Sequence, residues 1–294
     1  MQEKKIKVLI GCLLFSNYTG SEMYVYELAK GLKKLNCDVS IVSPNLGGPL
    51  TNKAIKEGFK IYSTNEPLIF EQYDIIHCQH KPIVDFLIKI FPNVKKICSI
   101  HSEVIDLENP IKHHSIVKYI AIRPEIKTHL IENFQINEKD IEIIYNPIDE
   151  TRFNTKNSTN NSNSLLFVGT IDFLRKNTIL DLVEYTKKNN KEFWLVGENH
   201  SNYLSFVLNH DHVKYSKSIF NVENYVKSCT ETAGILLGRT TIEGWLCGKP
   251  GWIYDIDKEG KIKGKTYHIP PEDIDKFYSI NVANQIKKLY KDIL

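Results

Sequence analysis

The sequence predicts an α/β protein with two domains, each built around a parallel β-sheet. Short apolar runs alternate with segments whose apolar residues recur every three or four positions. Runs that are apolar on both faces are typical of buried parallel strands, and the longer spacing is typical of amphipathic helices. The alternation stops at a polar stretch near the middle of the chain and then starts again, which indicates two separate sheets.

The first domain is expected over residues 1–153. Its predicted helices cover residues 22–36, 51–58, 82–91 and 124–134. Its predicted strands cover residues 6–15, 38–44, 59–63, 73–79, 95–102, 117–122 and 141–147. Because strands and helices alternate with short connections, these strands are expected to run parallel, with helices on both faces of the sheet.

A polar run, residues 154–163, is predicted as a linker because it cannot bury apolar surface. The second domain follows over residues 164–272. Its predicted strands cover 164–170, 192–197, 212–218, 233–238 and 251–256, and its helices cover 177–189, 222–230 and 241–248. An amphipathic helix over residues 273–294 closes the chain.

The charge of the chain does not indicate a nucleic-acid-binding protein. Residues 1–150 carry 18 Lys and Arg against 19 Asp and Glu, a net charge of −1, and residues 151–294 carry 20 against 16, a net charge of +4. A nucleic-acid surface is usually more basic and more clustered. The second half is compatible with a local anionic ligand.

The six cysteines are scattered and include no C-x-x-C pair, which argues against a zinc ribbon and fits a reducing compartment. No run approaches the roughly 20 apolar residues of a membrane span. The basic and apolar amino terminus has no small-residue cleavage site, so we interpret it as the first strand. We therefore expect a cytoplasmic protein, with peripheral membrane association left open.

The first candidate ligand loop is "SNYTGSE", between the first strand and its helix. Gly20 permits close approach of a ligand to the backbone, and the N–H groups that begin the helix, from Ser21 on, favour an anion. An ordinary helix cap by Ser21 or Thr19 explains the same residues equally well.

The second candidate loop is "FVGTIDFLRKN". Gly169 and Thr170 end a strand, and Arg175 and Lys176 precede a helix. Two neighbouring cations at the beginning of a helix are suited to a diphosphate. The alternative is a solvated basic turn.

The third candidate is "GRTTIEG". Arg239 and the hydroxyls of Thr240 and Thr241 stand where a strand gives way to a helix, and such positions bind phosphate oxygens. Glu243 follows one turn later and can accept hydrogen bonds from two ribose hydroxyls. The same residues also fit a capping box, with Thr240 as the N-cap and Glu243 three positions on.

Two further observations concern histidines and missing motifs. His101 ends a strand of the first domain, as either a ligand-facing group or a hydrogen-bonded strand terminus. The cluster "HCQH" does not favour metal, because adjacent strand residues point to opposite faces. The phosphate loop of nucleoside triphosphatases, the hydrolase elbow G-x-S-x-G and the dinucleotide motif G-x-G-x-x-G after the first strand are absent.

Seven segments together, in this order along the chain, resemble retaining glycosyltransferases of the GT-B fold, family GT4. They are "TGSEMYVYELAKGLKKLNCDVSIVSP", "YDIIHCQH", "SIHSE", "IEIIYNPIDETRF", "LLFVGTIDFLRKN", "FWLVGE" and "IEGWLCGKP". The resemblance implies two Rossmann-like domains facing a central cleft. The first domain would bind the acceptor and the second a nucleoside-diphosphate sugar. The last helix would pack back on the first domain.

The resemblance also implies a role for each candidate residue. Glu243 matches the glutamate that holds the ribose, and His101 matches the histidine near the transferred sugar. Lys176, with Arg175, matches the phosphate-binding lysine. The remaining predicted donor-site residues are Gly20, Ser21, Gly169, Thr170, Arg239, Thr240 and Thr241.

Two positions depart from the family pattern. Thr170 stands where an arginine is common, so Arg175 or Arg239 would supply the second cation. Ile235 stands where a first glutamate, eight residues before Glu243, usually contacts the donor sugar. The identity of the transferred sugar is therefore open.

The expected activity is transfer of a sugar, from a UDP-sugar in the first place, to a glycan or glycolipid precursor. No cofactor and no metal is expected, and His101 and Lys176 are the predicted catalytic residues. The alternatives are a transferase acting on modified DNA bases, a non-catalytic nucleotide-sugar-binding protein, and an epimerase or phosphorylase on the same two-domain fold. Nucleic acid is not favoured as a partner.

Overall fold

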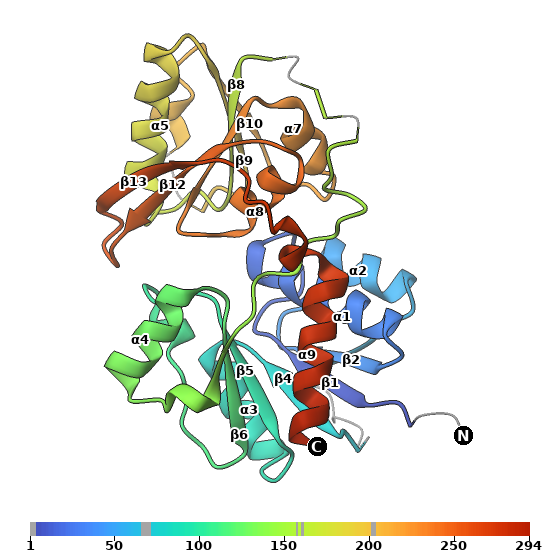
Figure 1. Ribbon diagram of the computed structural model, residues 1–294. Coiled ribbons are helices and arrows are strands. Elements are labelled where there is room, and N and C mark those ends of the chain that lie inside the picture. The colour runs from blue at the N-terminus through green and yellow to red at the C-terminus, as the bar shows by residue number, and fades with distance from the viewer. Residues whose placement is uncertain (1–3, 66–71, 157, 160–161, 201–203) are drawn as a thin grey trace. The chain divides into compact units, whose positions relative to one another are not determined.

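The computed structural model describes residues 4–65, 72–156, 158–159, 162–200 and 204–294 (Figure 1). Contacts divide the chain into two compact units. The first unit holds residues 1–17, 21–147 and 279–294, and the second holds residues 18–20 and 148–278. The division thus lies earlier than the predicted boundary at residue 153. Residues 154–163, predicted as a linker, belong to the second unit.

The first unit contains a seven-stranded sheet in the order β3-β2-β1-β4-β5-β6-β7, with every neighbouring pair parallel. The strands are β1 (Lys7–Gly11), β2 (Asp38–Ser43), β3 (Lys60–Ser63), β4 (Ile75–Cys78), β5 (Lys96–Ile100), β6 (Ile116–Ala121) and β7 (Ile141–Ile143). Each lies inside a predicted strand or overlaps one. The direction of winding reverses between β1 and β4, as in doubly wound α/β folds.

Helices cover both faces of this sheet. They are α1 (Gly20–Lys34), α2 (Pro49–Lys56), α3 (Lys81–Ile90), α4 (Pro124–Phe134) and α9 (Ser279–Ile293), with short 3₁₀ turns at Asp106–Glu108 and Glu138–Asp140. A Cβ on Gly11 would lie 2.4 Å from Leu87 of α3, so β1 and α3 pack closely on one face. The last helix, α9, lies beside α1, where Gly31 faces Ala283 (Figure 1).

A buried polar network joins α9 to the sheet and to α1. The His77 ring on β4 lies 2.7 Å from the Tyr290 hydroxyl of α9 through Nδ1 and 2.7 Å from the Ser99 hydroxyl of β5 through Nε2. Tyr24 of α1 completes the chain at 2.9 Å from Ser99. Burial, with a smaller effect of the His101 charge, lowers the pKa of His77 to about 3, so the ring stays neutral.

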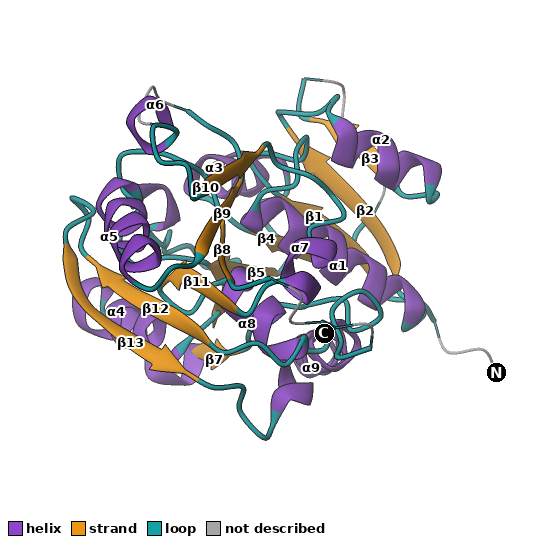
Figure 2. Ribbon diagram, turned by 90° about the horizontal axis from the view of Figure 1, so that it is seen from above, coloured by secondary structure: helices purple, strands orange, loops and turns teal. Residues whose placement is uncertain are grey.

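The second unit contains a six-stranded sheet in the order β10-β9-β8-β11-β12-β13. Its strands are β8 (Ser164–Val168), β9 (Glu192–Val196), β10 (Val213–Ser216), β11 (Glu231–Ile235), β12 (Gly251–Ile256) and β13 (Ile262–His268). The first five run parallel. The sequence analysis missed β13, which pairs antiparallel with β12 as a hairpin at one end of the sheet (Figure 2).

The helices of the second unit are α5 (Lys176–Lys188), α6 (Leu204–Val207), α7 (Glu223–Ser228) and α8 (Arg239–Leu246), with a 3₁₀ turn at Ile274–Phe277. The predicted final helix over 273–294 is therefore two elements, this turn and α9. Gly244 lets α8 lie close to β11, since a Cβ there would be 2.6 Å from the Thr232 hydroxyl. Among the described residues, no helix is long and apolar enough to cross a lipid bilayer.

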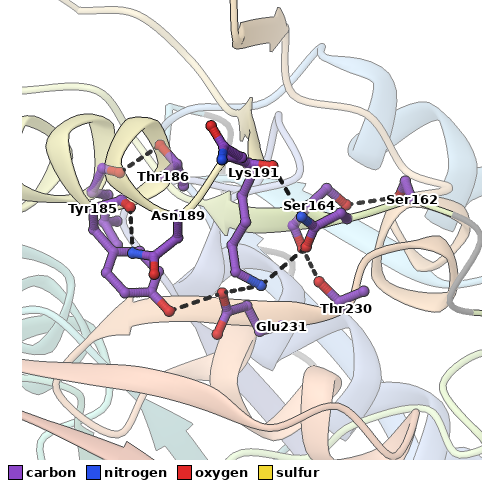
Figure 3. Close-up of polar contacts among 11 residues, drawn as sticks. Ser162, Ser164, Tyr185, Thr186, Asn189, Lys191, Thr230 and Glu231 are labelled. Carbon is purple, nitrogen blue, oxygen red and sulfur yellow. Dashed lines mark hydrogen bonds and ion pairs between the residues drawn. The ribbon is translucent and has the colours of Figure 1, made fainter.

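Polar side chains tie together the amino ends of the strands in the second sheet (Figure 3). Lys191, just before β9, pairs with Glu231 of β11 at 3.0 Å, and the Tyr185 hydroxyl donates to the same carboxylate at 3.3 Å. The Thr230 hydroxyl donates to the Ser164 carbonyl oxygen at 2.7 Å. Because ligands of such sheets bind at the carboxyl ends of the strands, this cluster serves stability.

We predict that Tyr290→Phe destabilises the protein by about 1–2 kcal/mol, because it removes the hydroxyl bound to Nδ1 of the buried His77 ring. Urea denaturation followed by fluorescence measures the effect. Tyr225→Phe is the matched control, since the Tyr225 ring is half-buried and its hydroxyl has no hydrogen bond to a described residue. Equal midpoints for the two variants would show that the network does not anchor α9.

Candidate functional site

The winding of the second sheet reverses between β8 and β11, and the predicted donor residues gather there. The chain leaves β8 toward α5 on one side and leaves β11 toward α8 on the other, which opens a space at the carboxyl edge of the sheet. Eight predicted residues lie on these two connections or at the start of the helices that follow. They are Gly169, Thr170, Arg175, Lys176, Arg239, Thr240, Thr241 and Glu243.

The two threonines in the first turn of α8 face the sheet. The Thr240 hydroxyl donates to the Val168 carbonyl oxygen at the end of β8, at 2.8 Å. The Thr241 hydroxyl lies against Gly234 of β11, is buried, and has no hydrogen-bond partner among the described residues. The Thr240 hydroxyl therefore positions α8, and the backbone N–H groups at the helix start are the candidates for phosphate contact.

The capping box considered for this helix is not formed. The N-cap is Gly238, which offers no side chain, and the Thr240 hydroxyl is bound to β8. The Glu243 carboxylate instead forms an ion pair with Arg239, with Oε1 3.0 Å from Nη2. Both side chains are largely buried, at 9% exposure for Arg239 and 6% for Glu243. A charged pair this enclosed persists because each charge compensates the other.

The loop after β8 is held against the loop after β9 by two glycines. The Gly169 N–H donates to the Val196 carbonyl oxygen at 2.9 Å. Gly197 has a φ of +159°, and a Cβ there would lie 1.9 Å from the Gly169 carbonyl oxygen. A side chain at residue 197 is therefore excluded. Gly197 was not predicted as a site residue, although a glycine directly after an apolar strand, as in "FWLVGE", often marks a close approach of two backbones.

In the basic turn before α5, Arg175 is paired with an acidic residue. The Arg175 guanidinium forms an ion pair with Asp172, whose carboxylate also accepts the Arg175 N–H at 3.1 Å. Arg175 is the N-cap of α5, and Lys176 is its first residue and is partly exposed. Asp172 thus neutralises much of the Arg175 charge in this turn.

The turn between β12 and β13 supports this basic turn. Gly260, with a φ of +72°, lies so close to Leu174 that a Cβ would be 2.6 Å from the Leu174 carbonyl oxygen. The Asn177 side chain of α5 donates to the Gly260 carbonyl oxygen at 2.9 Å. Asp257 accepts the N–H groups of Glu259 and Lys261, so its carboxylate shapes the turn. The unpredicted hairpin therefore fixes the position of Lys176.

Ile235, where the family pattern has a glutamate, ends β11 and packs against the apolar core of the second unit. The next residue, Leu236, has a φ of +55°, which lies in the left-handed region that residues other than glycine rarely adopt. Its N–H donates to the Tyr254 carbonyl oxygen at 2.7 Å. The chain therefore turns sharply from β11 into α8 with no carboxylate at residue 235.

The Gly20 loop carries its own anion. The Glu22 carboxylate, which is buried, accepts the N–H groups of Ser16 at 2.7 Å and Asn17 at 3.0 Å. Gly20, which contacts assign to the second unit, is exposed, and its nearest side-chain atom is Cδ of Arg239, 3.9 Å from the position of a Cβ. Ser21 offers its carbonyl oxygen to the Gln79 side chain at 3.1 Å.

His101 follows β5 in the first unit, within a group of polar residues at the carboxyl ends of β4 and β5. Its Nε2 lies 2.6 Å from Oε1 of Gln79, and its ring meets the Tyr24 ring edge-on, with centroids 4.6 Å apart. The Glu108 carboxylate accepts the His101 N–H at 3.1 Å and pairs with His80 at 3.2 Å. His101 is therefore hydrogen-bonded at the end of its strand, and it also stays partly exposed.

Glu108 is the buried charge of this group. Burial raises the pKa of its carboxyl, but the hydrogen bond with His80 and the nearby His101 outweigh that effect, so the pKa lies below its ordinary value. Gln79, His80 and Glu108 also line a small pocket. No cluster of three or more His, Cys, Asp or Glu side chains suited to a metal ion occurs among the described residues. Whether the reaction needs a metal stays a prediction.

The comparison with protein families identifies the first part of the chain. Residues 18–152 match the model of Glycosyltransferase Family 4. A search of the curated proteins finds no match.

Solved structures match nearly the whole chain. A glycosyltransferase from Rickettsia africae is 16% identical, with 99% of each chain covered and a TM-score of 0.69. The Anabaena protein Alr3699/HepE, in complex with UDP-glucose, is 15% identical over 98% of this chain and 90% of that one, with a TM-score of 0.68. An alpha-glucosyltransferase in complex with UDP and a 13-mer DNA is 12% identical over 99% and 92%, with a TM-score of 0.62.

The matches to solved structures confirm the predicted α/β GT-B fold. The match to the Family 4 model covers residues 18–152 and agrees with the predicted resemblance over that part of the chain. The residue roles stay predictions. The sequence analysis missed Gly197, Asp172 and Gln79, which act by holding predicted residues in place. In a single sequence, nothing marks a glutamine or an aspartate outside a recognisable motif as a residue that positions a site.

We predict that Gly197→Ala destabilises the protein by about 1–3 kcal/mol and displaces the loop of Gly169, because a methyl group cannot fit against the Gly169 carbonyl oxygen. Thermal unfolding measures the loss. Gly264→Ala in β13 is the control, since a Cβ there meets no atom within 4 Å. If Gly197→Ala were no more destabilising than Gly264→Ala, the close approach of the two loops would be disproved.

Proposed function

We propose that the chain is a glycosyltransferase that transfers a sugar from a nucleoside-diphosphate sugar to a glycan or glycolipid precursor. The GT-B fold and the match of residues 18–152 to the Family 4 model support this proposal. The observation that carries this proposal is the gathering of Lys176, the start of α8 and Glu243 at the winding reversal of the second sheet. A UDP-sugar is the first donor to test, since the Anabaena structure contains UDP-glucose.

The donor's nucleotide is assigned to the carboxyl edge of the second sheet. The N–H groups at the start of α8 carry the positive end of the helix dipole and are suited to the diphosphate. Lys176 adds a full positive charge from the other connection. Glu243 is assigned to the ribose hydroxyls, which can share its carboxylate with Arg239 or replace that contact.

The chemical step breaks the bond between the anomeric carbon and the diphosphate oxygen, through a transition state with oxocarbenium character. Negative charge builds on the leaving diphosphate, so fixed positive groups speed the reaction by stabilising it. Lys176 and the α8 amides supply that stabilisation, and Arg175 contributes less because Asp172 balances it. We propose retention of configuration, no metal, and a position for His101 beside the transferred sugar.

The acceptor is the least constrained part of the proposal. A glycan or glycolipid precursor is favoured, with the protein cytoplasmic and in peripheral contact with a membrane where the acceptor is a lipid. A DNA acceptor is the second candidate, because the alpha-glucosyltransferase of similar fold is in complex with DNA. The net charge of −1 over residues 1–150 speaks against it.

A screen of UDP-, GDP- and ADP-sugars by thermal shift tests the donor assignment, and isothermal titration calorimetry then measures affinity. We predict that Glu243→Ala lowers nucleotide affinity about tenfold or more, since a hydrogen bond to a charged group contributes roughly 1.5–3 kcal/mol. In an Arg239→Ala background the same change should still lower affinity, which separates ribose binding from loss of the ion pair.

Asp85→Ala is the matched control, because Asp85 forms an exposed ion pair with Lys81 at the same spacing on a helix of the first unit. A folded Glu243→Ala protein with unchanged affinity would remove Glu243 from the ribose site. Binding of a nucleotide sugar with neither hydrolysis nor transfer would favour the non-catalytic alternative.

A further inference from the structure

Gln79 connects the start of α1 with the ring of His101. It follows β4, is 2% exposed, and lies between two groups of the first unit. Its Nε2 donates to the Ser21 carbonyl oxygen at 3.1 Å, and its Oε1 lies 2.6 Å from Nε2 of His101. A carbonyl oxygen only accepts hydrogen bonds, so the NH₂ end of the amide must face Ser21 and the oxygen must face His101.

This orientation determines which nitrogen of His101 carries the proton. The Gln79 amide oxygen can only accept, and therefore His101 Nε2 must donate. In the neutral ring Nδ1 then holds the lone pair and is the accepting atom. The Ser21 carbonyl oxygen thus sets the orientation of the Gln79 amide, and that orientation sets the tautomer of the imidazole.

We propose that Gln79 is a positioning residue that fixes the tautomer and orientation of His101, with the proton on Nε2 and, in the neutral ring, the lone pair on Nδ1. This inference rests on the proposed function for the role of His101 in transfer. The tautomer itself follows from the hydrogen bonds and can be tested without any activity.

Other groups around the ring hold its place and charge but do not choose the tautomer. Glu108 binds the His101 backbone N–H, and its second oxygen pairs with His80. The Tyr24 ring packs edge-on against the imidazole, and the His80 ring lies 6.2 Å away between centroids. Burial and, to a smaller extent, the charge of His101 lower the pKa of His77. Gln79 alone among these groups has a hydrogen bond to a ring nitrogen of His101 that the geometry specifies.

Nitrogen-15 NMR of the full chain with labelled histidine reads the tautomer directly, with the His101 signal assigned through His101→Gln. We expect the Nε2–H form in the parent protein. Gln79→Met removes the acceptor, so the Nε2–H form should lose population to the Nδ1–H form. Turnover should fall about 10- to 100-fold, the size of effect seen for residues that orient metal-bound histidines. The KM for the donor should change little.

Gln79→Glu keeps an acceptor at the same atom and adds a negative charge. It should preserve the Nε2–H tautomer, raise the pKa of His101, and move the acidic limb of the pH–rate profile to higher pH. Gln285→Met, on the exposed face of α9, is the control for loss of a glutamine amide and should change neither signal nor rate.

An Nδ1–H tautomer in the parent protein, or an unchanged tautomer in a folded Gln79→Met protein, would overturn the proposal. So would full activity of Gln79→Met despite the altered tautomer. Failure of the proposed function would look different, because the parent protein would then bind no nucleotide sugar while the His101 signal stayed as expected.

Discussion

The hydrogen bond from the Thr240 hydroxyl to the Val168 carbonyl oxygen joins the two halves of the second sheet at the place where its winding reverses. Without that reversal, α5 and α8 would leave the sheet on the same side and their amino ends would have no space between them. With it, Lys176 and the α8 amides lie on the two connections that border one edge. The proposed chemistry depends on this constraint, because a diphosphate needs positive groups from both sides.

In the second unit, the groups that stabilise the sheet and the groups assigned to a ligand lie at opposite ends of the strands. At the amino edge, Lys191, Glu231 and Tyr185 bind one another and need no ligand (Figure 3). At the carboxyl edge, Arg239 and Glu243 are paired with each other while both are assigned to a ligand. Because a ribose must share or replace this ion pair, the nucleotide binds more weakly than its contacts with Glu243 alone would suggest. It also keeps two buried charges compensated before the donor arrives.

The sequence predicted the parallel strands well, because buried strands are apolar on both faces and their helices keep a regular spacing. The helix of residues 124–134 was predicted with the observed bounds. The strand β13 was missed because three lysines surround a single strongly apolar residue, Ile262, and the glycine at residue 264, a pattern that resembles an exposed loop. The capping box was considered because its spacing is local, whereas the actual partner of Thr240 is 72 residues away.

The same limit applies to the candidate site. Glu243, Lys176 and His101 could be named from short motifs, but Gly197, Asp172 and Gln79 act only through neighbours that the fold brings to them.

A crystal structure of the protein with a UDP-sugar tests the central claim most directly. The account predicts the diphosphate at the start of α8 within reach of Lys176, and the ribose on Glu243. A nucleotide bound away from the β8–β11 reversal, or a ribose out of reach of Glu243, would contradict it.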